Sequence, residues 1–201
     1  SGQVCISVQR ILAHESVFEP FCRGLVAELA KLKPGDPLDE DTTIGPLISE
    51  GAAKRTEAWV EEAVAGGARV LAGGKREGNY LPPTVLTGTR PEMKVNCCEV
   101  FAPLVTVEPF SDFNDALRLV NDSLYGLQAG IFTRDAQRIM RAWRELEVGG
   151  VIINDIPTLR LDHMPYGGVK LSGQGREGVR PAIEEMTEPK LLALNLGDQQ
   201  E

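Results

Sequence analysis

The stretch from residue 105 to residue 154 alternates between short apolar runs and amphipathic segments of about ten residues. Extended runs at 105–110, 129–132 and 151–154 are separated by helical patterns at 112–120 and 135–146. Neighbouring strands that run in the same direction need a crossover connection, which is usually a helix. The alternation therefore predicts an α/β fold with a parallel sheet covered on both faces, and the runs AGIF and GVIIN are typical of strands buried on both sides.

The residues before this stretch carry the signals of further helices and strands. Apolar residues recur at three- and four-residue intervals between residues 17 and 32. The pair Ser16 and Glu19 has the spacing of a capping box at the start of this helix, and Pro34–Gly35 stops it. The other elements that the sequence predicts are strands at 11–13, 69–72 and 83–86 and helices at 49–65 and 176–186.

Glycine-rich and terminal segments complete the chain. Residues 155–175 are rich in glycine and have no periodicity, and a loop of this length inside a compact domain is usually functional or disordered. No glycine cluster forms GxGxxG between a strand and a helix, so the chain has no dinucleotide-binding fingerprint of its own. The apolar run at 190–196 resembles a strand that must pair within this subunit or with another one, and the polar tail GDQQE follows it.

Charge and cysteine content exclude several classes of protein. The formal net charge of −8 argues against a protein that binds nucleic acid through its phosphates. No apolar run approaches the roughly 20 residues that span a bilayer, and the N-terminus lacks the features of a signal peptide, so we expect a cytoplasmic protein. The four cysteines and two histidines have neither disulfide-framework nor zinc-site spacing, and no metal is expected.

Ten short motifs, taken in order, resemble the C-terminal half of the NAD(P)-dependent aldehyde dehydrogenase superfamily. They are GQVC at 2–5, GDPLD at 35–39, GPLI at 45–48, PPTVL at 82–86, CEVFAP at 98–103, ND at 121–122 with YGL at 125–127, IFT at 131–133, Asn154, PYGGVKLSGQGREG at 165–178 and MTEPK at 186–190. The resemblance implies a parallel-sheet catalytic domain over residues 1–185 and a C-terminal oligomerisation strand with a polar tail over 186–201. It also implies that the family's nucleotide-binding domain is missing from this chain, which alone should be nearly inactive.

The resemblance identifies Cys5 as the nucleophile. A thiolate adds to an aldehyde carbonyl, the thiohemiacetal releases hydride to the nicotinamide of NAD or NADP, and water hydrolyses the thioester that remains. In the family this cysteine lies at the start of a short helix, whose N–H groups favour the thiolate. The chain does not indicate which of the two cofactors is used.

Two further motif positions are expected to contact the cofactor. The resemblance implies that Glu99 accepts hydrogen bonds from the nicotinamide ribose and that Phe101 packs near the same end. The sequence departs from the family's EE-x-F-G-P pattern at Cys98 and at Ala102. Alanine at position 102 matters only if that position needs a positive φ, which alanine tolerates poorly.

The loop around residues 155–168 is expected, by resemblance, at the mouth of the aldehyde tunnel. Asn154, Arg160, His163 and Tyr166 are the candidate substrate-binding residues. Arg160 could grip a phosphate, sulfonate or carboxylate, or it could pair with Asp162 within the loop. The run RLDHMPYGGVKLSG is similar to members that act on small hydroxy-, phospho- or sulfo-aldehydes. The family also implies a homodimer or homotetramer.

Two alternatives belong to other functional classes. One is a thiol hydrolase or acyl-transfer enzyme, in which His14 or His163 would activate Cys5 from within hydrogen-bond reach. The other is a non-catalytic assembly module, in which the apolar run LLALNL pairs with another subunit.

Overall fold

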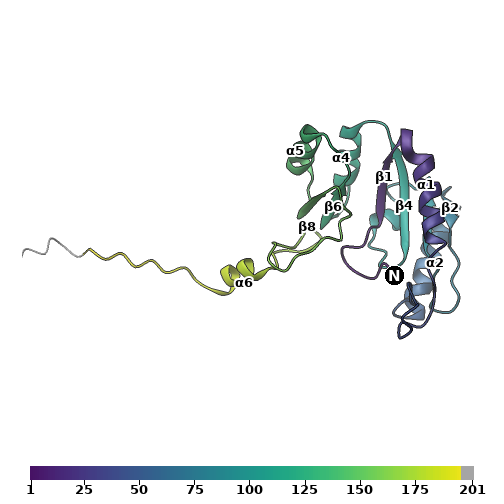
Figure 1. Cartoon of the computed structure of the whole chain (residues 1–201), viewed down its shortest axis with the longest axis horizontal. Helices are drawn as coiled ribbons and strands as arrows, with labels where there is room; N and C mark the ends of the chain where they lie inside the picture. Colours follow the sequence, from purple (N-terminus) through teal and green to yellow (C-terminus); the bar gives the residue numbers. More distant parts are fainter. Residues whose placement is uncertain (196–201) are drawn as a thin grey trace, which may run out of the picture.

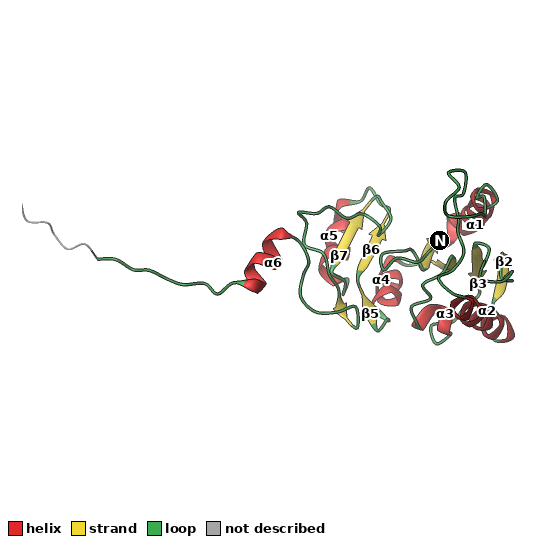
Figure 2. Cartoon of the chain, turned by 90° about the horizontal axis from the view of Figure 1, so that it is seen from below, coloured by secondary structure: helices red, strands yellow, loops and turns green. Residues whose placement is uncertain are grey.

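The computed structural model describes residues 1–195, most of which form two lobes (Figure 1). We call residues 1–110 the first lobe and residues 113–178 the second lobe. Helix α6 (Val179–Met186) and the segment after it extend away from both lobes (Figure 2). The described part of the chain contains no helix that is long and apolar enough to cross a membrane.

The first lobe is organised around a sheet of four strands. Their order is β1 (Arg10–His14), β4 (Leu104–Phe110), β3 (Thr84–Thr87) and β2 (Arg69–Ala72). The first three strands run parallel, with Arg10 opposite Thr106, whereas β2 pairs antiparallel with β3 at one edge. The connection from β2 to β3, residues 73–83, contains no helix, because an antiparallel pair needs no crossover.

One helix packs on each face of this sheet. Val85 on β3 is buried against α1 (Glu15–Leu29), and the next residue, Leu86, is buried in the cluster that contains α2 (Glu50–Ala65). Successive strand residues point to opposite faces, so apolar residues at consecutive positions require cover on both sides. This lobe is thus a three-layer arrangement in which β3 and β4 are the buried centre.

The second lobe pairs two parallel strands with two helices. In chain order it contains α4 (Phe113–Asn121), β6 (Gln128–Ile131), α5 (Ala136–Glu145) and β7 (Gly150–Ile153). Each helix begins after an aspartate whose side chain accepts from backbone N–H groups of the first turn, a favourable N-cap. Both helices share one apolar cluster with the strands.

Short elements join these units. They are α3 (Lys94–Cys97) and the antiparallel pair β5 (Tyr125–Gly126) and β8 (Val169–Lys170). The Arg10 guanidinium links the lobes by donating from β1 to the carbonyl of Leu119 in α4, at 2.9 Å.

The α/β class with parallel strands is confirmed, but the strands of the described residues form three separate sheets rather than one. The strands β6 and β7 are half-buried, and within them only Ile152, at 9% exposure, counts as buried. The prediction that both faces of these strands are covered is therefore wrong for this chain. Apolar runs predict burial, but they do not specify which element supplies the cover.

Two helix boundaries also differ from the prediction. The helix α1 begins at Glu15, because β1 continues to His14 and the His14 imidazole accepts from the Ser16 N–H at 3.2 Å. Ser16 is therefore inside the helix and is not its cap. The same helix ends at Leu29, before the predicted stop at Pro34–Gly35.

The C-terminal segment is extended and exposed. Residues 187–195 contain no helix or strand, so the predicted strand at 190–196 is absent as far as residue 195. Leu191, Leu192 and Leu194 are 89, 84 and 72% exposed. The tail GDQQE lies outside the described residues.

Candidate active site

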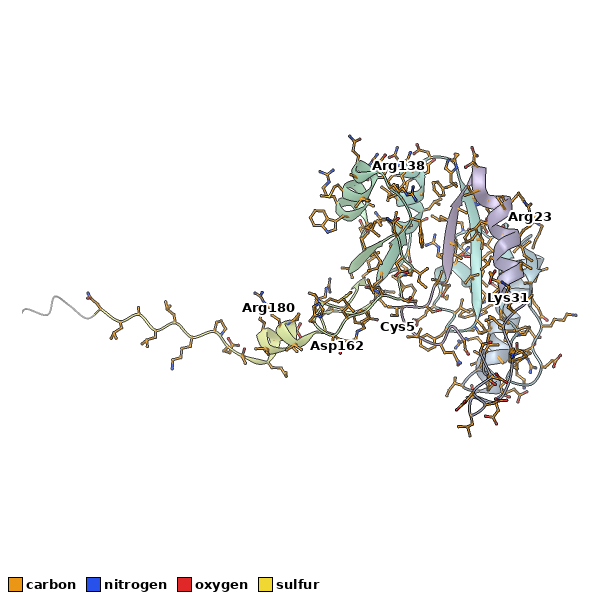
Figure 3. The ribbon with its side chains drawn as sticks, in the orientation of Figure 1. Cys5, Arg23, Lys31, Arg138, Asp162 and Arg180 are labelled. Carbon is orange, nitrogen blue, oxygen red and sulfur yellow. The ribbon has the colours of Figure 1, made fainter. Side chains whose placement is uncertain are left out.

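Cys5 is exposed and belongs to a turn that precedes β1. Figure 3 shows it below the space between the two lobes. A turn, and not the start of a short helix, surrounds this thiol, so the helix-dipole contribution expected from the resemblance is absent here. The chain enters β1 five residues later, at Arg10, a position fixed by the pairing of β1 with β4.

The residues before Cys5 are fixed by close contacts with two other motifs. Gly2 has φ +72°, and a Cβ at this position would lie 2.1 Å from the Ala102 carbonyl oxygen. The Gln3 side chain donates to the Pro46 carbonyl and accepts from the Ile48 N–H at 2.8 Å. The motifs GQVC, GPLI and CEVFAP, which are far apart in the sequence, therefore meet around the thiol.

Gln9, which follows Cys5 in the chain, holds the CEVFAP motif beside it. Its Nε2 donates to the carbonyls of Val95 and Cys98, at 3.0 and 2.7 Å. Its Oε1 accepts from the Val100 N–H at 3.0 Å. One side chain therefore holds both sides of Glu99 in the CEVFAP motif.

Glu99 and Phe101 line a small hollow of about 30 Å³ that also reaches Cys5. Both side chains are exposed, and Phe101 has the unusual φ of +53°. The positive φ falls on Phe101, whereas Ala102 lies outside that region and is buried among the apolar residues of the first lobe. The departure to alanine at position 102 is therefore compatible with this backbone.

A second cleft, of about 340 Å³, opens on the other side of Cys5. The Tyr166 hydroxyl lies 2.8 Å from the Cys5 sulfur. Burial, and then the hydrogen bond with Cys5, raise the pKa of Tyr166 to about 12. The further lining residues come mainly from the glycine-rich loop and α6: Ser172, Gln174, Arg176, Glu177 and Glu185.

Arg160 pairs with Glu177 and not with Asp162. Its Nη2 donates to Glu177 Oε2 at 2.8 Å, and its guanidinium lies 4.8 Å from the centre of the Tyr166 ring. A backbone bridge, in which the N–H groups of Tyr166 and Glu177 each donate to the other residue's carbonyl, brings this partner close. The interpretation of Arg160 as a partner of Asp162 is therefore wrong.

Asn154 and His163 do not line either hollow at Cys5. The Asn154 residue has φ +58°, and its Oδ1 accepts from the Thr133 N–H at 2.9 Å, which fixes the exits of β6 and β7. His163 is exposed, and His14 contacts Ser16 and the ring of Phe110. The roles of Asn154 and His163 as substrate ligands stay predictions.

Sequence patterns missed several residues that shape the site. Gln9 bonds to backbone groups about 90 positions away, and no periodicity marks such contacts. Arg176 donates from Nη1 to the carbonyls of Gly168 and Gly175, so it fixes the loop over the second cleft. The motif block at 165–178 was the available signal for Arg176. Within residues 1–195, no three His, Cys, Asp or Glu side chains are grouped so that they could hold a metal ion.

Known proteins are similar to this chain in sequence and fold. The model of the aldehyde dehydrogenase family matches residues 1–192. The 3-sulfolactaldehyde dehydrogenase of Priestia aryabhattai is 52% identical, over 98% of this chain and 41% of the relative.

Two solved structures extend this similarity to the fold. Aldehyde dehydrogenase 21 from Physcomitrella patens, in complex with the reaction product succinate, superposes with a TM-score of 0.95 at 47% identity, over 98% of this chain and 41% of the other. Glyceraldehyde-3-phosphate dehydrogenase from Methanocaldococcus jannaschii, complexed with NADP, gives 0.88 at 42% identity, over 92 and 40%. The chain thus spans about two fifths of the length of these relatives. It belongs to the aldehyde dehydrogenase family.

Proposed function

We propose that the whole protein oxidises an aldehyde to a carboxylic acid with NAD or NADP, and that Cys5 is its nucleophile. The observation that carries the proposal is the position of Cys5 between two hollows. One is lined by Glu99 and Phe101 and the other by Tyr166 and the glycine-rich loop. A nucleophile with access from two sides can meet a carbonyl carbon on one side while a hydride acceptor approaches from the other.

The chemistry at Cys5 follows from its thiol. The sulfur forms a C–S bond to the carbonyl carbon while the carbonyl electron pair moves to oxygen. Loss of hydride from that carbon gives a thioester, and attack by water breaks the C–S bond to release the acid. A bound nicotinamide supplies the hydride acceptor. The exposed Glu99 carboxylate suits hydroxyl groups of a ribose, and Phe101 offers an apolar wall beside it.

We propose that the aldehyde is small and carries an anionic group. The Arg160 guanidinium lies over the ring of Tyr166, which lines the cleft, and the Arg160 side chain is 44% exposed. One of its five N–H donors is used by Glu177, so the guanidinium can also bind a sulfonate, phosphate or carboxylate. One relative is named for a sulfonated aldehyde and another for a phosphorylated aldehyde, which supports this class.

The nucleophile is tested by comparing Cys5→Ser with Cys22→Ser in the complete protein. Cys5→Ser should abolish NAD(P)H formation, whereas Cys22 lies on the buried side of α1 against the sheet and its substitution should preserve the activity. The 201-residue chain alone should give no steady NAD(P)H production. An active Cys5→Ser enzyme would refute the role of Cys5. Steady NAD(P)H production by the 201-residue chain alone, at rates typical of whole enzymes, would refute the expectation that the chain alone is inactive.

The substrate class is tested with Arg160→Gln in the complete protein. Loss of a hydrogen bond to a charged group should lower kcat/KM for 3-sulfolactaldehyde by about 10- to 100-fold. The same substitution should change kcat/KM for neutral lactaldehyde about threefold or less, because this aldehyde makes no charged contact with Arg160. Equal losses for both aldehydes would contradict recognition of the anionic group by Arg160.

We also propose that the C-terminal segment joins copies of the protein into a homodimer or homotetramer. The three exposed leucines of residues 190–195 favour this second role, since an apolar strand-like run is stabilised by pairing. Sedimentation of the complete protein should show a smaller assembly after Leu192→Asp than after Glu188→Asp. An unchanged assembly would contradict the role of the segment.

A Cys/His hydrolase is not supported by the contacts of Cys5, because neither histidine hydrogen-bonds to Cys5 in the described residues.

A further inference from the structure

Tyr166 contacts the thiol that the proposed chemistry uses. Its hydroxyl is 2.8 Å from the Cys5 sulfur, and the two residues are 161 positions apart in the chain. Tyr166 is buried, at 8% exposure, whereas Cys5 is exposed. The hydroxyl of a buried phenol therefore contacts an accessible sulfur. A tyrosine hydroxyl in this position can donate to a thiolate, which is an acceptor only.

Other residues fix the orientation of this phenol. The Arg160 guanidinium covers the face of the ring at 4.8 Å, and Glu177 holds the guanidinium through a 2.8 Å hydrogen bond. The backbone of Glu177 in turn pairs with that of Tyr166. Glu177, Arg160, Tyr166 and Cys5 therefore form a continuous series of contacts that ends on the nucleophile.

We propose that Tyr166 is a catalytic residue that donates its hydroxyl hydrogen bond to the Cys5 thiolate, and that Arg160 is a positioning residue that holds the phenol ring in place. This inference rests on the proposed function only in taking Cys5 as the nucleophile. The Tyr166 phenol stays protonated at the pH values at which a thiol ionises, since the pKa of Tyr166 is raised to about 12. The donor is thus present whenever the thiolate forms.

A thiolate that accepts this hydrogen bond forms at lower pH but is a weaker nucleophile. A hydrogen bond to a charged group corresponds to about tenfold in the thiolate population at neutral pH. The same hydrogen bond lowers the nucleophilicity of the thiolate. On a logarithmic scale this fall is a little under half of the gain in thiolate population, so it is about threefold. The hydrogen bond should therefore raise the Cys5 alkylation rate about threefold at neutral pH and lower it about threefold in strong alkali.

The experiment measures alkylation of Cys5 by iodoacetamide against pH in the 201-residue chain. Mass spectrometry of the Cys5 peptide separates this thiol from the other three. In Tyr166→Phe the rate should fall about threefold near pH 7 and rise about threefold above about pH 10, so that the two profiles cross. A general loosening of the loop would not produce opposite changes at the two ends of the profile.

Tyr125→Phe is the matched control, because it removes a phenol hydroxyl in the same lobe from a residue that does not line the Cys5 cleft. Its profile should match that of the unaltered chain. If the Tyr166→Phe profile is unchanged, the hydrogen bond has no effect in solution. If it is faster at neutral pH, the thiol donates to the tyrosine. Either outcome overturns the proposal. Because alkylation requires no cofactor or aldehyde, failure here leaves the proposed oxidation untouched.

The role of Arg160 is tested by a double-mutant cycle. Arg160→Gln alone should shift the profile in the same direction as Tyr166→Phe, by a smaller factor, because the ring loses its cover. In the Tyr166→Phe background, Arg160→Gln should have no further effect. If the same shift persists in that background, Arg160 acts on the sulfur directly through its charge, and its role as a positioning residue is refuted.

Discussion

Replacing Gln9 with glutamate should destabilise the protein far more than one isosteric exchange normally does. The Gln9 amide donates to the carbonyls of Val95 and Cys98 and accepts from the Val100 N–H. A carboxylate keeps the acceptor, loses both donors and places negative charge beside two carbonyl oxygens. Each lost donor costs about 1 kcal/mol, and the repelled carbonyls add to this, which gives a total of about 2–3 kcal/mol.

Thermal unfolding followed by circular dichroism measures this loss at neutral pH. In a chain of about 200 residues, 1 kcal/mol shifts Tm by about 2–4 °C, so a loss of about 5–10 °C is expected. The destabilisation should shrink as the pH falls, because a protonated carboxyl regains one donor. Gln137→Glu on the exposed start of α5 is the matched control and should be nearly neutral. Equal stability of the two variants would refute the role given to Gln9.

Three further predictions concern the neighbourhood of the site and the first lobe. Gly2→Ala should destabilise the chain by about 1 kcal/mol or more, since it forces a positive φ and a contact with the Ala102 carbonyl; Gly24→Ala, on α1 with open space around it, should instead stabilise by about 0.5–1 kcal/mol. Melting temperatures that move in the same direction would contradict this. Glu57→Gln should cost about 1 kcal/mol, because Glu57 holds the half-buried Arg76 guanidinium, whereas the same exchange at the exposed Glu61 should cost almost nothing in urea unfolding. Finally, the raised pKa of Tyr166 means that the folded state keeps a proton that the unfolded state loses, so its contribution to stability is complete below about pH 10 and is lost between pH 10 and 12. This alkaline loss should be smaller in Tyr166→Phe, as urea midpoints against pH would show.

Local patterns predict the elements of this fold because each element carries its own signal. The stretch from 105 to 154 contains β4, α4, β6, α5 and β7 close to the predicted bounds. Asp112 and Asp135, at the predicted starts of two helices, act as their caps. Periodicity and capping depend on neighbours within four residues, which a sequence displays directly.

A sequence does not display the contacts between distant elements in this way. A Ser16–Glu19 pair has the spacing of a capping box, but the pairing of His14 with Phe110 extends β1 past that point. Arg160 has an acidic residue two positions away, yet its partner is Glu177, which a backbone bridge brings closer. Where local signals and tertiary pairing disagree in this chain, tertiary pairing decides the outcome.

The contacts around Cys5 also determine when the site can form during folding. The thiol segment contacts residues at separations of 43, 89 and 161 positions. Loops of such length cost entropy to close before any contact is gained, so non-local contacts form slowly. The helices and the β6–β7 unit can form while Cys5 still lacks its phenol partner. A newly made chain therefore passes through a stage in which Cys5 does not yet lie beside Tyr166 and its cleft has not formed.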